Sequence, residues 1–323
     1  MFGAGRKVAL RDSEPGHLLD IMAGHADWAV IVCLVGNGQE IHDGEGGLAE
    51  WGAALATRPH WRVLATPQTL TASDPRQRLS TMPGLAIRDT LHLDVPVRSI
   101  RNTAASAWVD AVRAGDAAEA ASIARTQGPI PFLLTRSLAD LRRHLRGASR
   151  GLRRGGLVAS SGAKILRADG LGVEVPHMDS NAVANWFLDR WPDVRAGDAL
   201  ETVATEFSCQ GLELDFVRLC WGGDLVRRAG RADWVVRSFA GTEWQERRGS
   251  ERMANRLNTY RVLLTGARYE TVIWVPHGDP NNETRDPATL DAVARFLRAC
   301  GVDDLAMTAR EPATTDAPAA MLV

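Results

Sequence analysis

The residue types with the most specific chemistry lie together at positions 204–213, in the sequence ATEFSCQGLE. Gly211 is typical of a place where the backbone must approach a ligand closely, because glycine has no side chain. Glu213 provides a carboxylate that can accept a hydrogen bond from a ribose hydroxyl. Thr205 and Gln210 add a hydroxyl and an amide to the same stretch. The pattern indicates a nucleotide or nucleic-acid site; the alternative is the start of a helix after a strand, with Glu213 solvated.

Lysine is nearly absent from the chain, and this bears directly on phosphate chemistry. Only Lys7 and Lys164 are present among 38 basic residues. A phosphate loop of the pattern G-x-x-x-x-G-K-[ST] needs a lysine that reaches the β- and γ-phosphates. Neither lysine has the preceding glycines or the following hydroxyl residue. The sequence therefore contains no ordinary phosphate loop.

A glycine turn at 36–38 follows an apolar, β-branched run at 29–35 and precedes Gln39. The run predicts a strand buried on both faces of a parallel sheet. Ligands of open α/β sheets bind beyond the carboxyl ends of such strands. As a dinucleotide fingerprint the turn is incomplete, because Ile41 stands where the third glycine belongs. A dinucleotide-binding enzyme is therefore disfavoured, and a plain strand-to-loop turn remains an alternative.

Arginines are concentrated at 142–154, at the end of a predicted helix and in the loop after it. Guanidinium groups spaced along one surface can contact successive phosphates of a nucleic acid. The best candidates for such a patch are Arg142, Arg143, Arg146 and Arg150. The alternative is a solvated helix end in an arginine-rich chain.

Composition limits the class of protein. The 323 residues are long enough for two domains, and 45% hydrophobic content with a net charge of −1 describes a globular chain. No apolar run is long enough to span a membrane, and the N-terminus does not resemble a signal peptide. A cytoplasmic protein is expected. The four cysteines and eight histidines show no metal-ligand spacing, so no metal site is expected from them.

The elements that must position these residues alternate between strands and helices, which predicts an α/β fold with parallel sheets. Strands are predicted at 29–35, 61–65, 90–95, 131–135, 156–161, 200–207, 214–221 and 270–276. Helices are predicted at 48–55, 104–114, 117–126, 137–145, 182–188, 250–264 and 287–300. The Ala-, Thr- and Pro-rich end of the chain is expected to be a flexible tail.

Several segments resemble one family closely. The runs VCLVGNGQEIHDGEGGLAEW at 32–51, GLVASSGAKILRADGL at 156–171 and YRVLLTGAR at 260–268, with the segment at 204–213, resemble the Schlafen group 3-like DNA/RNA helicase domain family of bacteria. The resemblance covers residues 13–302. It implies a superfamily 1 helicase-like protein with two RecA-like domains, ATP and Mg²⁺ in the cleft between them, and single-stranded DNA or RNA as partner.

The resemblance also implies roles for individual residues. Gln39 matches the motif III glutamine that senses the γ-phosphate, and Arg98 matches a motif IV arginine that reaches it. Both are the candidates for a catalytic role. The nucleotide-binding candidates in motifs V and VI are Thr205, Gln210, Gly211, Glu213 and Arg268.

Two departures from the family pattern limit what these residues could do. The family's phosphate loop and Asp-Glu magnesium motif precede motif III, and only about 30 residues do so here. Gly266 also occupies the position of the motif VI arginine, and the loss of such an arginine can cost about 10³–10⁵ in rate. We expect that Arg268 does not replace it, because residues two apart on a helix point about 200° apart.

The resulting hypothesis is an N-terminally truncated helicase-like protein without autonomous ATP hydrolysis. Residues 1–127 would be the C-terminal part of the first RecA-like domain, 128–303 the second, and 304–323 a tail. The alternative is a non-catalytic nucleic-acid-binding or regulatory module with a degenerate helicase fold.

Overall fold

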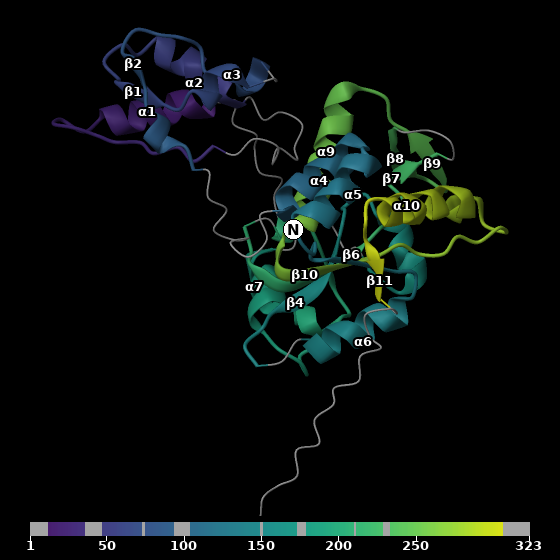
Figure 1. Ribbon diagram of the computed structural model, residues 1–323. Helices are drawn as coiled ribbons and strands as arrows, with labels where there is room; N and C mark the ends of the chain where they lie inside the picture. Colours follow the sequence, from purple (N-terminus) through teal and green to yellow (C-terminus); the bar gives the residue numbers. More distant parts are fainter. Residues whose placement is uncertain are drawn as a thin grey trace, which may run out of the picture. The chain divides into compact units, whose positions relative to one another are not determined.

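The computed structural model describes residues 12–35, 47–72, 75–93, 104–148, 151–172, 179–209, 211–228 and 233–305. The chain divides into two compact units, Met1–Pro96 and Val97–Val323 (Figure 1).

The first unit combines short helices with a small parallel sheet. Ser13 begins the first helix, because its hydroxyl accepts a hydrogen bond from the amide of Gly16. Leu19, Leu48 and Ala54 are buried. The elements are α1 (Glu14–Ala23), α2 (Gly47–Ala56), β1 (Val63–Ala65), α3 (Gln68–Thr71), η1 (Pro75–Gln77), β2 (Leu85–Ile87) and η2 (Asp89–Leu91), with β1 and β2 paired in parallel.

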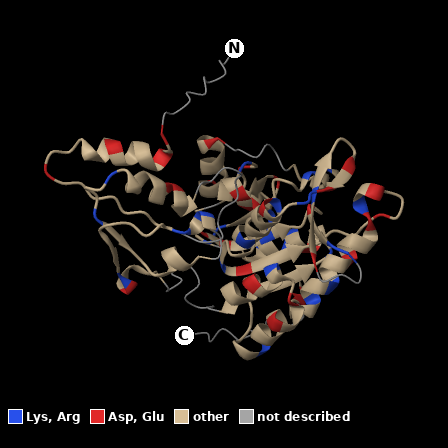
Figure 2. Cartoon of the chain, turned by 90° about the horizontal axis from the view of Figure 1, so that it is seen from above, with Lys and Arg blue, Asp and Glu red and all other residues tan. Residues whose placement is uncertain are grey.

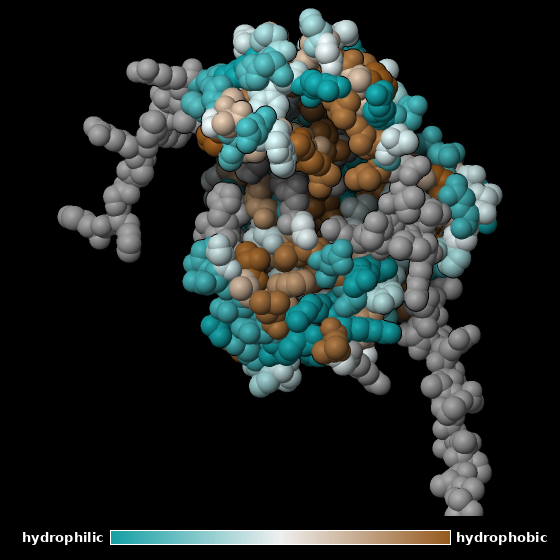
Figure 3. All heavy atoms as spheres, turned by 90° about the vertical axis from the view of Figure 1, so that its left-hand side faces the viewer, coloured by the Kyte–Doolittle hydropathy of each residue, from teal (hydrophilic) through white to brown (hydrophobic). Residues whose placement is uncertain are grey.

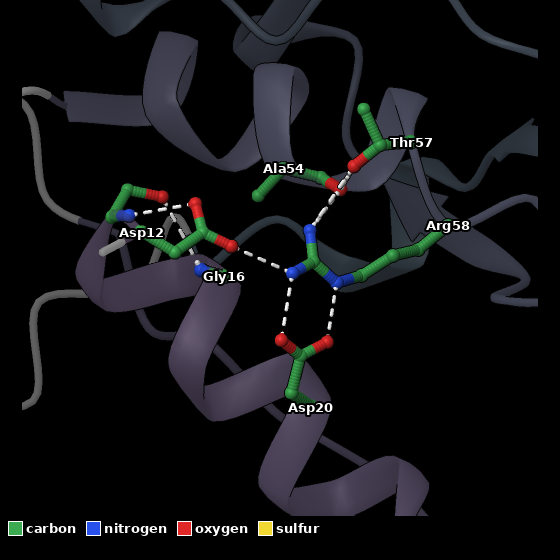
Figure 4. A network of polar contacts seen from close by, with 7 residues as sticks. Asp12, Gly16, Asp20, Ala54, Thr57 and Arg58 are labelled. Carbon is green, nitrogen blue, oxygen red and sulfur yellow. Dashed lines mark hydrogen bonds and ion pairs between the residues drawn. The ribbon is translucent and has the colours of Figure 1, made fainter. Parts of the chain in front are cut away.

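Arg58 joins α1 to the end of α2 (Figure 4). Its guanidinium donates to both carboxylate oxygens of Asp20, at 2.7 and 2.9 Å, and to Asp12 at 2.7 Å. It also donates to the carbonyl of Ala54 at 3.0 Å, which satisfies a carbonyl at the end of α2. The hydrogen bonds from Arg58 lower the pKa of both Asp12 and Asp20 below the ordinary value.

The apolar segment at 29–35 is not the buried strand that its sequence predicts. The structure gives it no regular secondary structure, and Val32 and Leu34 are 78% and 82% exposed. A strand buried on both faces needs neighbouring strands and covering helices. The one sheet described in this unit, β1–β2, does not pair with the segment. Figure 3 shows hydrophobic residues, in brown, on the face of the molecule that it draws.

The second unit is built on a six-stranded sheet in which every pairing is parallel. The α/β prediction with a RecA-like parallel sheet is confirmed at this level. The strand order is β11-β3-β10-β6-β4-β5. The strands are β3 (Phe132–Thr135), β4 (Gly155–Ala159), β5 (Val203–Thr205), β6 (Leu214–Cys220), β10 (Ala267–Trp274) and β11 (Asp303–Asp304).

Helices cover both faces of this sheet because its central strands are apolar on both sides. Val217 and Leu219 of β6 belong to one core cluster, whereas Phe216 and Cys220 belong to the other. The first cluster includes residues of α4 (Ala104–Ala114), α5 (Ala117–Thr126), α9 (Ser250–Leu264) and α10 (Pro287–Ala299), together with Trp186 of α7 (Ser180–Leu188). The second cluster includes Leu141 and Leu145 of α6 (Leu138–Ala148), which lies on the other side of the sheet from α4, α5, α9 and α10 in Figure 1.

The strand register aligns the carboxyl ends of three strands. Ala159, the last residue of β4, pairs with Thr205 at the end of β5 and with Cys220 at the end of β6. The residues that follow these strands therefore emerge at one edge of the sheet. β6 rises about 3.3 Å per residue, which places its amino end about 20 Å from that edge.

A three-stranded antiparallel sheet, formed by the residues that follow β6 and precede α9 in the sequence, is not among the elements expected from the sequence. It consists of β7 (Leu225–Arg227), β8 (Trp234–Ala240) and β9 (Glu243–Glu246). The strand predicted at 200–207 is also shorter than expected, because β5 ends at Thr205 and α8 (Glu206–Cys209) begins directly after it. The strand predicted at 90–95 is wrong for the described residues, since 89–91 form a 3₁₀ turn.

Helices α4 and α5 pack with the second unit. Trp108 of α4 is fully buried, stacks on Phe132 of β3, and donates its indole N–H to the carbonyl of Cys300 at 2.9 Å. The boundary between two RecA-like domains at 127/128, predicted from the family resemblance, stays a prediction.

Candidate functional site

A polar cluster lies beyond the carboxyl ends of β4, β5 and β6, where open α/β sheets bind their ligands. Asp224 is at its centre and has no exposed surface. Its carboxylate accepts hydrogen bonds from the hydroxyl of Ser160 at 2.6 Å and from the hydroxyl of Tyr260 at 2.7 Å. Arg256 of α9 adds an ion pair at 2.8 Å. The cluster thus joins the end of β4, the β6–β7 turn and α9.

Burial and neighbouring charges together set the protonation of Tyr260 and Arg256. Burial and the adjacent Asp224 carboxylate raise the pKa of Tyr260 well above its usual value, so the phenol stays a hydrogen-bond donor. Burial by itself would lower the pKa of Arg256, but Asp224, Tyr260 and Glu206 together outweigh it, and the pKa lies above its ordinary value. The guanidinium therefore stays charged and Asp224 keeps its cationic partner.

A second carboxylate, Glu206, is buried beside this cluster at the start of α8. Its two oxygens accept hydrogen bonds from the amide and the hydroxyl of Ser161, at 2.8 and 2.7 Å. Burial raises the pKa of Glu206 above its ordinary value in spite of these hydrogen bonds. Thr205, predicted as a nucleotide-binding residue, immediately precedes it and is 1% exposed.

The loop after β4 fits against this cluster only because it contains glycine. A Cβ added to Gly162 would lie 2.7 Å from a carboxylate oxygen of Asp224 and 3.1 Å from the guanidinium of Arg256. A Cβ added to Gly222 would lie 2.0 Å from the Cβ of Ala163. The two loops therefore interlock closely, and the cluster forms a closed, internally hydrogen-bonded network.

The opposite, amino edge of the sheet brings together other residues predicted from the sequence. Glu213 directly precedes β6, and Arg268 is the second residue of β10. Their side chains are 51% and 50% exposed and form a loose ion pair at 3.8 Å. Gly211 precedes Glu213 with a φ of +86°, a backbone conformation that favours glycine. Gly266, at the motif VI arginine position, lies between the end of α9 and β10.

The expectation that Arg268 points away from position 266 rests on a wrong premise. It requires both residues to lie on one helix, but α9 ends at Leu264 and Arg268 belongs to β10. Because the chain changes from helix to strand between Leu264 and Arg268, the 200° angle between side chains two apart on a helix does not apply to positions 266 and 268.

The predicted nucleotide-binding set is therefore divided between two places. Thr205 lies at the carboxyl edge, whereas Gly211, Glu213 and Arg268 lie at the amino edge. Four other site residues predicted from the sequence lie outside the described residues: Gln39, Arg98, Arg150 and Gln210.

The arginines of α6 differ in their accessibility. Arg142 is partly buried and points a guanidinium N–H at the carbonyl of Leu200, at 3.4 Å. Arg143 is exposed but paired with Asp140 at 2.7 Å, and Arg146 is exposed. Figure 2 shows basic and acidic residues interspersed over the cartoon.

The sequence holds a usable signal for the buried cluster, although the cluster is not among the predicted sites. Arg256 and Tyr260 are four residues apart in a helix that the sequence predicts correctly, and such residues share a face. Ser160 lies near the carboxyl end of the strand predicted at 156–161, and the observed strand ends one residue before it, at Ala159. Asp224 lies in a glycine turn after β6 and gives no signal of its own.

Metal ligands and membrane-spanning helices are both absent from the described residues. Across the ranges given above, no group of three or more His, Cys, Asp or Glu side chains could hold a metal ion. Within the same ranges, no helix is long and apolar enough to cross a membrane.

The comparisons with known proteins decide the family. The family model for the Schlafen group 3, DNA/RNA helicase domain matches residues 5–277 of the 323-residue chain. This chain belongs to that family. No curated protein and no solved structure matches the chain. Family membership agrees with the parallel α/β sheet of the second unit.

The family suggests ATP with Mg²⁺ as cofactor, and the residues of this chain fit that pair only in part. Glu213 and Arg268 have the chemistry to contact a ribose hydroxyl and a phosphate. The phosphate-loop lysine that would hold the β- and γ-phosphates is missing from the sequence. Within the described residues, the fit to ATP with Mg²⁺ is thus confined to Glu213 and Arg268.

Proposed function

We propose that this chain forms the nucleotide-facing and nucleic-acid-binding part of a helicase-type motor and does not hydrolyse ATP by itself. The observation that carries this proposal is the meeting of Glu213 and Arg268 at the amino edge of the sheet, beside Gly266. Both side chains are half exposed, so a ligand could replace their weak mutual contact at little cost.

The proposed roles follow from the chemistry of each group. Glu213 would accept a hydrogen bond from a ribose hydroxyl, with the backbone at Gly211 close to the ligand. Arg268 would contact a phosphate, and Gln39 and Arg98 would approach the γ-phosphate as the family pattern implies. Charge developing on the transferred phosphoryl group would still lack a phosphate loop and the motif VI arginine, which explains why no turnover is expected.

The partner in this proposal is single-stranded DNA or RNA, and the location is the cytoplasm. The predicted patch of Arg142, Arg143, Arg146 and Arg150 is retained as one candidate contact region. The double variant Arg143→Gln/Arg146→Gln tests the two members of this patch that are exposed on α6.

An ATPase assay with single-stranded DNA or RNA tests the proposal. We expect a rate at the background of a protein-free control, with and without nucleic acid. Turnover well above background that disappears in Arg98→Ala would refute it. Intact mass of the native protein adds a second check: a value above 35.0 kDa would mean that the natural chain carries further sequence, and the assay would then be repeated on that longer form.

A second candidate, a non-catalytic nucleic-acid-binding or regulatory module, is favoured by the surroundings of Gly266. A Cβ at this position would meet only ordinary contacts, the nearest being the carbonyl of Val262 at 3.4 Å. Its φ is not among the positive values of the chain. The local fold thus does not require glycine at position 266. The missing arginine is then consistent with a protein whose function does not depend on ATP hydrolysis. Nucleic-acid binding without ATP dependence would support this candidate over the first.

A further inference from the structure

A groove of about 370 Å³ lies between the antiparallel sheet and the first turn of α9. Its apolar part is formed by Trp234, Val235, Val236 and Met253, and Arg247 and Arg248 stand beside them. The volume falls in the range of sites that hold small molecules or single groups of a larger ligand. None of the sequence-predicted site residues that the structure describes lines this groove.

The floor of the groove is closely packed against the core. Trp234 and Val236 are 6% and 4% exposed, and the indole N–H of Trp234 donates to the carbonyl of Val112 at 2.9 Å. The Trp234 ring also stacks on Trp221 at 5.8 Å between ring centroids. A ligand would therefore meet a preformed apolar surface and would not need to order it, which lowers the entropic cost of binding.

The charges around the groove are unbalanced toward the positive side. Glu246, the acidic residue in its lining, forms an ion pair with Arg228. The backbone of Arg247 is fixed by a hydrogen bond from its amide to the carbonyl of Val236 at 2.9 Å. Across the part of the chain that the structure describes, neither Arg247 nor Arg248 is paired with an acidic side chain. These two adjacent guanidinium groups differ in this respect from Arg143 of α6, which Asp140 neutralises.

We propose that this groove binds single-stranded nucleic acid, with phosphates held by Arg247 and Arg248 and an adjoining base or sugar packed against Met253 and Val235. Planar guanidinium groups suit phosphate oxygens, and an apolar surface beside them suits a base in any sequence. The inference rests on the proposed function for its ligand class and adds the surface that binds it. An acidic peptide has similar charge but lacks flat bases, so it serves as the competing outcome in the test.

The test measures fluorescence anisotropy of labelled oligo(dT) and oligo(U) of about 12 nucleotides over a salt series. Three double variants are compared with the wild-type chain: Arg247→Gln/Arg248→Gln in the groove, Arg143→Gln/Arg146→Gln on α6, and Arg125→Gln/Arg295→Gln as a matched control. The control removes the same charge from exposed positions on α5 and α10. Thermal unfolding of each variant verifies that the fold is retained.

We expect the groove variant to lose about tenfold or more in affinity and the control to lose little. The slope of log affinity against log salt should fall by about 0.7 for each phosphate that the variant no longer neutralises. Val235→Glu, which keeps both arginines but places a carboxylate in the groove, should weaken binding as well. Val235 is half buried, so its thermal unfolding is compared with that of the wild-type chain.

Each contrary result has a separate meaning. If the wild-type chain binds and the groove variants bind equally well, the groove inference is overturned, and a selective loss in the α6 variant would assign binding to that helix. Polyglutamate stands for the acidic peptide in this test. If the wild-type chain binds polyglutamate more tightly than both oligonucleotides, the groove inference is also overturned. If the wild-type chain binds neither oligonucleotide, the proposed function itself fails.

Discussion

The carboxyl and amino edges of the parallel sheet carry polar residues of opposite character. At the carboxyl edge, Asp224 is fully buried and accepts hydrogen bonds or an ion pair from three side chains. At the amino edge, Glu213 and Arg268 are half exposed and 3.8 Å apart. Buried polar groups are expensive to leave without partners, whereas exposed pairs contribute little. The first edge is therefore arranged for stability, and the second is free to exchange its contacts for a ligand.

One short motif connects the two edges. Residues 204–213 leave β5 at the carboxyl edge, where Glu206 is buried, and reach β6 at the amino edge, where Glu213 is exposed. A motif that looks like one site in the sequence thus serves two places about 20 Å apart, the length of one strand. Its residues should respond differently to substitution.

The largest effect is expected for Asp224→Ala. The change leaves the buried charge of Arg256 and the hydroxyls of Tyr260 and Ser160 without their acceptor, and breaking such a buried pair costs about 3–5 kcal/mol. Urea denaturation followed by circular dichroism measures the change. A loss below about 1 kcal/mol would mean that the network contributes little to stability, in conflict with the contrast between the edges.

Gly162→Ala should come second. The new methyl group would lie 2.7 Å from a carboxylate oxygen of Asp224, and such overpacking costs about 1–3 kcal/mol. Gly266→Ala is the matched control at the other edge, where a Cβ meets ordinary contacts and stability should rise by up to about 1 kcal/mol. Equal destabilisation by both substitutions would contradict the close fit at the carboxyl edge.

A pH dependence follows from Glu206. Its pKa is higher in the folded chain than the ordinary value of 4.5, so folding favours its protonated form. Its contribution to stability is complete below pH 4.5 and is lost as the pH rises through the folded pKa. The measurement is the free energy of unfolding of the wild-type chain and Glu206→Gln from about pH 4.5 to neutral pH. The wild-type chain should lose stability relative to the variant over this range, and parallel curves would disprove the burial effect.

The smallest effect on stability is expected at the amino edge. Glu213→Ala and Arg268→Ala should each change the free energy of unfolding by less than about 1 kcal/mol, because the pair is exposed. The same urea experiment applies. A larger loss in either variant would show that this edge is also structural.

Much of the second unit follows from its sequence. Apolar strands such as 214–221 and the amphipathic helix at 287–300 are predicted close to their observed bounds, because their patterns are strong and local. The segment at 29–35 carries an equally strong strand pattern, yet it is exposed in the structure, because a pattern does not supply the neighbours that a strand needs.

The candidate site is less accessible to sequence reasoning. Gly211 and Glu213 stand out through their motif, whereas Asp224 is a single acidic residue in a glycine turn. Its importance depends on Ser160 and Tyr260, which lie 64 and 36 residues away in the chain. Contacts of this kind depend on strand order and register, which no local pattern encodes.

Double-mutant cycles on the two edges test the central contrast most directly. One cycle combines Asp224→Asn with Tyr260→Phe, and the other combines Glu213→Gln with Arg268→Gln, each followed by urea denaturation. Residues of one buried network couple by about 0.5–3 kcal/mol, and we expect the upper half of that range for Asp224 and Tyr260. For Glu213 and Arg268 we expect about 0–0.5 kcal/mol. Equal coupling energies at the two edges would contradict the division into a structural edge and a ligand-facing edge.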